Sequence, residues 1–201
     1  IPLPAPVTSA TFPATIPLPV PMGARYLMRR QNMNSRYGSA VSADPTVPNA
    51  VVIRPPFDPV ARPFHTLTDD QWDAAWESPL RHTIEALVAA HAAGARRVVV
   101  MVPTTAMSGG AQYAHVAAAA EAIRVLVKST ARQWGADGIT VNAVAVSPVE
   151  FGIDAEVAGP TSIAPAALPH ANSDALVAFL CSEAAADITG QTLVVDGGVW
   201  M

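Results

Sequence analysis

The apolar run RRVVVMVP at residues 96–103 constrains the fold of this chain more than any other feature. Four valines and one methionine follow each other without a polar residue, so neither face of such a strand suits water. This pattern is typical of a parallel strand covered by helices on both faces. Three further segments have strand character, namely AVVI at 50–53, GITVNAVAVSP at 138–148 and QTLVVDGG at 191–198. The sequence therefore predicts a buried, parallel sheet.

Helical segments alternate with these runs. Thr68 and Gln71 have the spacing of a capping box at the start of a helix, and the acidic residues between them suit its first turn. Ser78 followed by Pro79 predicts that this helix ends and a second one begins. The second helix runs through LRHTIEALVAAHAA and ends at Gly94.

A long helix is predicted over residues 109–134, and a shorter one over 173–185 with Ser173 as its N-cap. One face of the long helix carries an apolar stripe at helical spacing, made of Val116, Ala120, Ile123, Val127 and Ala131. The alternation of strands and helices predicts a doubly wound, mostly parallel α/β sheet with right-handed crossovers.

Residues 1–49 differ from the rest of the chain. The segment IPLPAPV at 1–7 recurs as IPLPVPM at 16–22, and prolines at this density favour extended backbone. We expect either an irregular segment or an arm on a partner subunit. The chain is thus predicted to be one domain overall, with an α/β core over 50–201 that follows a truncated, proline-rich part over 1–49.

Composition excludes several classes of function. Hydrophobic residues make up 51% of the chain and charged residues 14%, with a net charge of −4, so a nucleic-acid partner is not expected. Apolar stretches are much shorter than a membrane span requires, and we expect no membrane association. Cys181 is the only cysteine and the histidines are scattered, so neither an intrachain disulfide nor a metal site is expected, and a cytoplasmic location is.

The segments GITVNAVAVSP, LTDDQWDAAW and ITGQTLVVDGG resemble the short-chain dehydrogenase/reductase family over roughly residues 50–201. The resemblance implies a Rossmann-like fold, a nicotinamide cofactor, and catalysis by serine, asparagine and a Tyr-x-x-x-Lys pair. In that pair, lysine stabilises the phenolate and holds the nicotinamide ribose.

These catalytic positions hold other residues here. When VKSTARQW is matched to the family pattern, Val116 takes the place of the tyrosine and Ala120 that of the lysine. The family's asparagine falls on Pro79, and Thr104 or Thr105 stands near the place of its serine. We therefore predict no catalytic residue in this chain.

The expected cofactor motifs are absent as well. Residues 1–49 contain only Gly23 and Gly38, which cannot form the family's glycine-rich turn. RPPF at 54–57 replaces the family's Asn-Asn-Ala-Gly, and VSP at 146–148 replaces its Pro-Gly. We expect this chain to bind no cofactor, with NAD or NADP carried by a partner.

The leading hypothesis is a non-catalytic subunit of a heteromeric dehydrogenase or reductase. The partner would be an active member of the same family in a hetero-oligomer, with a heterotetramer as the expected form, acting on a hydroxyacyl or ketoacyl substrate. The terminal Trp200 and Met201 are expected to be buried against a neighbour.

Two alternatives remain open from the sequence. The first is a ligand-binding or regulatory module that uses the vacated cofactor cleft. The second is a self-sufficient enzyme with altered chemistry, which would depend on Tyr113, His115, Glu121 and a threonine at 104 or 105. We interpret Tyr113 as a packing aromatic and His115 as a surface or capping residue at a helix start.

Overall fold

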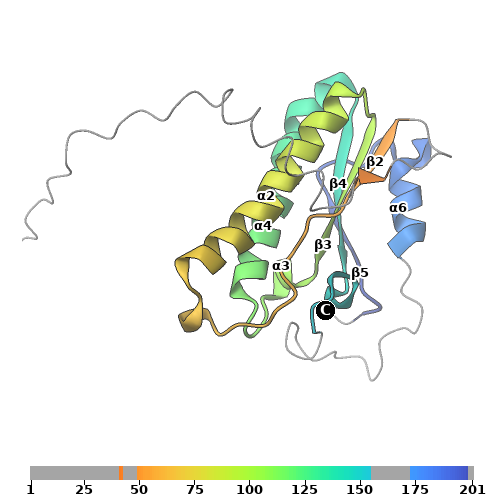
Figure 1. Cartoon of the computed structure of the whole chain (residues 1–201). Coiled ribbons are helices and arrows are strands. Elements are labelled where there is room, and N and C mark those ends of the chain that lie inside the picture. Colours follow the sequence, from red (N-terminus) through yellow and green to blue (C-terminus); the bar gives the residue numbers. More distant parts are fainter. Residues whose placement is uncertain (1–40, 43–48, 155–172, 199–201) are drawn as a thin grey trace, which may run out of the picture. The chain divides into compact units, whose positions relative to one another are not determined.

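The computed structural model describes residues 41–42, 49–154 and 173–198 (Figure 1). Within them lies a sheet of five strands in the order β1-β2-β3-β4-β5. Their bounds are Val41–Ser42, Ala50–Ile53, Arg97–Pro103, Thr140–Val146 and Thr192–Val195. Strands β2 to β5 are parallel, and β1 runs antiparallel to β2. The four predicted strands and their parallel arrangement are thereby confirmed.

Every residue of β3 and β4 is buried, as expected for parallel strands that are covered on both faces. The two strands pair in register from Arg97 opposite Thr140 to Pro103 opposite Val146. Successive side chains of a strand point to opposite faces of a sheet. Accordingly, Val98 and Val100 belong to the larger apolar cluster on one face, and Met101 belongs to a smaller cluster on the other.

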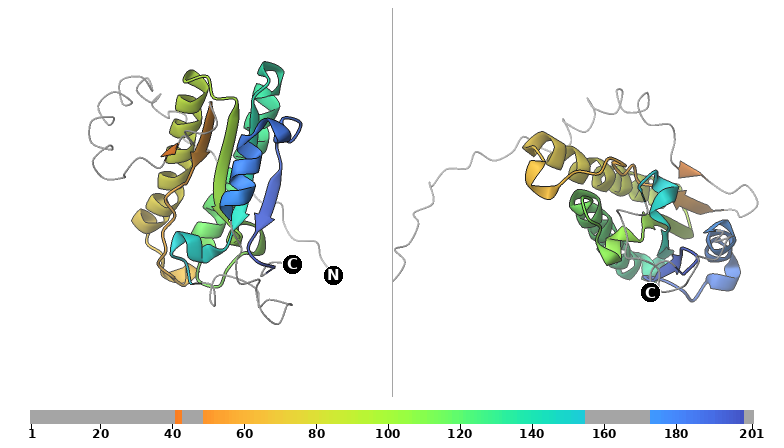
Figure 2. Two further views of the ribbon diagram at one scale, coloured as in Figure 1. Left: turned by 90° about the vertical axis from the view of Figure 1, so that its right-hand side faces the viewer. Right: turned by 90° about the horizontal axis from the view of Figure 1, so that it is seen from below.

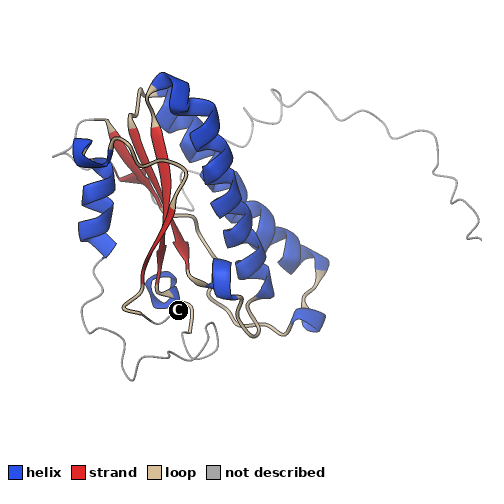
Figure 3. Cartoon of the chain, turned by 180° about the vertical axis from the view of Figure 1, so that it is seen from behind, coloured by secondary structure: helices blue, strands red, loops and turns tan. Residues whose placement is uncertain are grey.

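Helices cover both faces of the sheet. Helices α2 (Asp69–Ala92) and α4 (Ala114–Trp134) lie side by side on one face, and α6 (Ser173–Cys181) covers the other (Figures 2 and 3). The shorter helical turns are η1 (Phe64–Thr66), α3 (Thr105–Ser108), η2 (Gly135–Asp137), η3 (Pro148–Phe151) and η4 (Glu183–Ala185). The described residues include no helix long and apolar enough to cross a membrane.

Helix α2 corrects one prediction. The capping box forms, with the Thr68 hydroxyl accepting from the Gln71 amide, but the helix does not restart at Ser78 and continues through the buried Pro79. A proline in a helix removes one backbone hydrogen bond. Here the Pro79 carbonyl accepts from the Thr83 hydroxyl at 2.7 Å as well, and packing of the buried helix face keeps the two halves together.

Helix α4 begins at Ala114, five residues later than the predicted start of the segment. Gly109 ends α3 with a φ of 70°, a backbone conformation that glycine adopts at low cost. The predicted apolar stripe from Val116 to Ala131 is confirmed, because all its members are buried against the sheet.

The last crossover differs in hand from the two before it. The strands are added in one direction from β2 to β5, yet α6 lies on the face opposite α2 and α4 (Figure 2). The connection from β4 through α6 to β5 therefore has the opposite hand, and the prediction of right-handed crossovers throughout is wrong. A sheet that is apolar on both faces needs a helix on each, and α6 is the helix that meets this need.

Helix α6 is described from Ser173, the residue predicted as its N-cap, and the residues that precede it lie outside the described part of the chain. The Ser173 hydroxyl donates to the Glu150 carboxylate at 3.2 Å. The rest of the 1–49 segment apart from β1 and Asn49, including the IPLP repeats, lies outside the described residues, as do Trp200 and Met201.

A buried side-chain amide helps to hold the turn before β5. Asn142 in β4 donates to the Ile188 carbonyl at 2.7 Å and accepts from the Gln191 amide at 3.0 Å. Because both backbone groups belong to the segment that enters β5, this side chain helps to position the last strand, together with backbone hydrogen bonds that join Val141 and Ala143 to the same segment.

Candidate functional site

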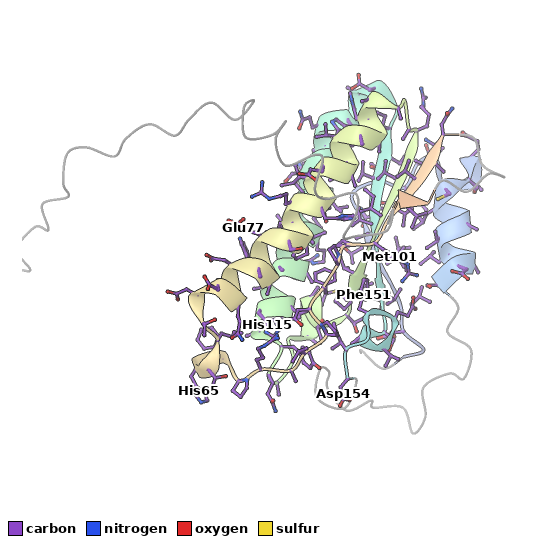
Figure 4. The ribbon with its side chains drawn as sticks, viewed as in Figure 1. His65, Glu77, Met101, His115, Phe151 and Asp154 are labelled. Carbon is purple, nitrogen blue, oxygen red and sulfur yellow. The ribbon has the colours of Figure 1, made fainter. Side chains whose placement is uncertain are left out.

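The carboxyl ends of β2, β3 and β4 meet at one edge of the sheet, which is where parallel α/β folds place their ligands. These strands end at Ile53, Pro103 and Val146. The loop at residues 54–63, the turn η3 and the start of α4 come together here, and Figure 4 labels His115, Phe151 and Asp154 at this edge. We call residues 54–63 the edge loop.

The two positions matched to the catalytic pair lie inside the core. Val116 is 1% exposed and Ala120 is fully buried, and both pack with Ile123 in the larger apolar cluster. Neither side chain carries a group that can donate, accept or move a proton. The buried face of α4 therefore supplies packing at the place where the resemblance implied an acid and a base.

The other matched positions also have structural surroundings. Pro79 is buried within α2. Thr104 precedes α3, and its backbone N–H donates to the Val146 carbonyl at 2.9 Å. Thr105 is fully buried in α3, and its hydroxyl has no hydrogen-bond partner within the described residues. The two threonines thus form the buried turn that joins β3 to α4.

Tyr113 is a packing aromatic, as predicted. It is 1% exposed, its hydroxyl donates to the Pro59 carbonyl at 3.1 Å, and the same oxygen accepts from the Asp154 backbone N–H at 3.3 Å. The phenol thus links the edge loop, the start of α4 and the segment after η3. Its proton is engaged in a structural hydrogen bond, which disfavours a role as a catalytic acid.

His115 corrects the sequence interpretation. It is 1% exposed rather than on the surface, and its ring lies 6.2 Å from that of Tyr113 in a stacked arrangement. Burial lowers the pKa of His115, although the nearby Asp58 carboxylate acts in the opposite direction. Position 115 lies beside Val116 in the first turn of α4, where the helix meets the edge loop. Its burial therefore depends on residues far away in the sequence, and sequence reasoning missed it.

The structure brings together only part of the set proposed for altered chemistry. Tyr113 and His115 are neighbours, whereas Glu121 forms an ion pair with Arg124 one turn along α4. That contact raises the pKa of Arg124 through the hydrogen bond to Glu121. Glu121 is therefore engaged on the helix surface.

The edge loop closes onto the protein with its own side chains. Phe57 is buried and meets Phe151 edge to face, with ring centroids 5.3 Å apart. Arg54 pairs with Glu150 at 3.4 Å, which joins the residues after β2 to those after β4. In the resemblance, these two loops line the two ends of the cofactor site.

The described residues do not fit a nicotinamide cofactor. The ribose would need hydrogen-bonding groups near positions 116 and 120, and the structure has buried apolar side chains there. The loops expected to line the cofactor contact each other through Phe57 and Phe151. Among the described residues, no group of three or more His, Cys, Asp or Glu side chains is arranged to hold a metal ion.

Comparison with known proteins agrees with the fold. Residues 42–200 match the family model described as enoyl-(acyl carrier protein) reductase. This chain belongs to the short-chain dehydrogenase/reductase (SDR) family. It is 34% identical over 146 residues to the 3-oxoacyl-[acyl-carrier-protein] reductase FabG of Salmonella typhimurium, covering 67% of this chain and 60% of that protein.

Other SDR relatives have different substrates in their names. The A-factor type gamma-butyrolactone 1'-reductase of Streptomyces virginiae is 32% identical over 167 residues, covering 68% of this chain and 59% of that protein. A solved SDR structure from Mycobacterium ulcerans superposes with a TM-score of 0.61 at 21% identity, covering 75% of this chain and 59% of that one. The chain thus spans about three fifths of the length of these relatives.

Proposed function

We propose that this SDR chain is a non-catalytic subunit of a heteromeric, NAD(P)-dependent dehydrogenase or reductase in the cytoplasm. The observation that carries the proposal is the burial of Val116 and Ala120 in the apolar core at the positions of the family's tyrosine and lysine. An active SDR partner would carry the cofactor and the proton-transfer residues. This chain would complete the oligomer and support the partner's site.

The outer surface of the helical layer supports a partner at that face. On α2, Trp76, Ile84 and Val88 recur at helical spacing, with Ile84 48% and Val88 55% exposed. Val125 on the adjacent α4 is 49% exposed. Apolar side chains grouped on neighbouring helices favour burial against another protein surface. We expect the active SDR subunit to pack here.

A hydroxyacyl or ketoacyl substrate for the complex is favoured by the comparisons. The matching family model is described as an acyl-carrier-protein reductase, and FabG is named for a 3-oxoacyl substrate. The substrate would bind to the partner, because the described residues of this chain offer no proton-transfer group at the matched positions.

The test is native mass spectrometry of the assembly purified, without overexpression, from cells that make this chain. A stoichiometric second chain with a Tyr-x-x-x-Lys pair would support the proposal. Charged substitutions Ile84→Glu and Val88→Glu on the exposed α2 face should release that chain, whereas Val149→Glu, at another exposed valine, should not. A homo-oligomer or a monomer as the only species would refute the proposal.

A further inference from the structure

His115 stands out among the described histidines because both of its ring nitrogens are buried without a hydrogen-bond partner. His82 has one such nitrogen. A buried polar group without a partner loses its hydration and gains nothing in exchange. The ring is tolerated in its neutral form, since a charged imidazolium would need partners for two N–H donors.

The groups known to act on His115 lie at the start of α4 and in the edge loop. Tyr113 stacks on the ring with planes 27° apart. The charged groups that act on it are Asp58 and Arg62 of the edge loop. Asp58 and the Val60 backbone favour the charged form of the His115 ring, whereas Arg62 disfavours it. The Val60 backbone does not complete a hydrogen bond to the ring. The neighbouring α3, with the sequence TAMS, contributes no titratable side chain.

The edge loop is tied to the start of α4 by hydrogen bonds to Gln112 and Tyr113, which precede His115 in the chain. The Arg62 backbone N–H donates to the Gln112 carbonyl at 2.8 Å. The Tyr113 hydroxyl donates to the Pro59 carbonyl at 3.1 Å, and Asp58 and Arg62 form an ion pair within the loop. A positive charge on His115 would be attracted by Asp58 and repelled by the Arg62 guanidinium, and it would lack hydration because both ring nitrogens are buried. Because burial outweighs the attraction of Asp58, protonation of His115 acts against the closed position of the loop.

The direction of the pH effect follows from linkage. Burial lowers the pKa of His115 in the closed state, whereas an exposed histidine in an open state has a pKa of about 6.5. The open state then binds protons more readily between the lowered pKa and about 6.5. The closed state is fully stable above about pH 6.5 and loses stability as the pH falls below that value.

We infer that His115 is a pH-sensitive latch: the neutral ring keeps the edge loop closed on the carboxyl edge of the sheet, and its protonation in weak acid releases the loop. Release uncovers apolar surface of the loop that is buried in the closed state, including that of Phe57. This latch does not depend on the proposed function, because it concerns only contacts within this chain.

The test is amide hydrogen exchange of the full chain at pH 7.5 and pH 5.5, read by mass spectrometry and corrected for the intrinsic effect of pH on exchange. Opening of residues 54–63 should increase by up to about tenfold at the lower pH. Peptides from β3 should keep their protection. Equal protection of the loop at both pH values would overturn the inference.

A substitution series separates the latch from general acid sensitivity. His115→Phe keeps an aromatic ring and removes the titration, so loop opening should no longer depend on pH. His65→Gln, at an exposed histidine in the adjacent η1, is the matched control and should behave like the unaltered chain. A pH response that persists in His115→Phe would refute the latch. If that variant does not fold, NMR titration of the His115 ring in the unaltered chain decides, since a midpoint at or above about 6.5 contradicts it.

Discussion

Replacing Ala120 by lysine restores the family's residue and tests whether its position is core or cleft. Ala120 is fully buried on α4 between apolar neighbours. In a working SDR site, a lysine would be accommodated by polar surroundings and a cofactor. In this structure the described neighbours of Ala120 in the same cluster are apolar, so we expect Ala120→Lys to destabilise the fold severely.

The magnitude follows from two costs. Burial that lowers the pKa of a lysine by about three to four units costs about 4–5 kcal/mol at pH 7, because the protonated form is less stable in the folded state than in the unfolded state. Adding the long side chain to a packed core costs about 1–3 kcal/mol more. The sum approaches the total stability of about 5–15 kcal/mol that is typical of a domain.

Urea denaturation followed by circular dichroism measures this cost. Ala122→Lys, half-buried on the same helix, is the matched control and should change the free energy of unfolding by about 0.5 kcal/mol or less. The unfolded state of Ala120→Lys binds the extra proton up to a pKa of about 10.4. Its stability relative to the unaltered chain should therefore rise with pH, by up to about 1.4 kcal/mol per pH unit.

Equal stabilities for the two lysine variants, with no extra pH dependence for Ala120→Lys, would refute this reasoning. Such a result would mean that a lysine at position 120 reaches solvent or a polar cleft. The position could then serve a cofactor, and the burial argument for a non-catalytic subunit would lose its main support.

Three further changes test the packing around the site and the sheet. Asn142→Ala should lower the free energy of unfolding by about 2–4 kcal/mol, because the Ile188 carbonyl and the Gln191 amide lose their partner; a loss under about 0.5 kcal/mol in urea denaturation would contradict this. Phe57→Ala should cost about 3–5 kcal/mol, against less than about 1.5 kcal/mol for Phe57→Leu, and similar costs would argue against tight packing at the sheet edge. Thr68→Ala should cost about 1 kcal/mol through loss of the α2 cap, measured by thermal unfolding, and an unchanged midpoint would show that the cap contributes nothing.

Local sequence patterns predicted the elements that depend on neighbouring residues. The run of valines specified β3, and Thr68 with Gln71 specified the start of α2. The apolar spacing from Val116 onward specified which face of α4 is buried. These features follow from periodicity and capping, which act within a few turns of the chain.

The candidate site was predicted in part. The matching of Val116 and Ala120 to the catalytic pair came from the family pattern and stays a prediction, whereas the structure shows that both side chains lie in one apolar cluster. The edge loop was recognised only as RPPF in place of the family's residues. Its contacts through Phe57 and Phe151 join segments far apart in the chain, and no local pattern encodes such a pairing.

Taken by itself, the sequence determined the order of strands and helices, the parallel sheet and the absence of the family's catalytic pair from α4. The tertiary structure decided that α2 continues through Pro79, that α6 crosses to the opposite face of the sheet and that His115 is buried. Each of these outcomes depends on which distant segment packs against a residue. Burial and packing energies accumulate over the whole core, and they override the local preference of a proline to end a helix or of a histidine to remain at the surface.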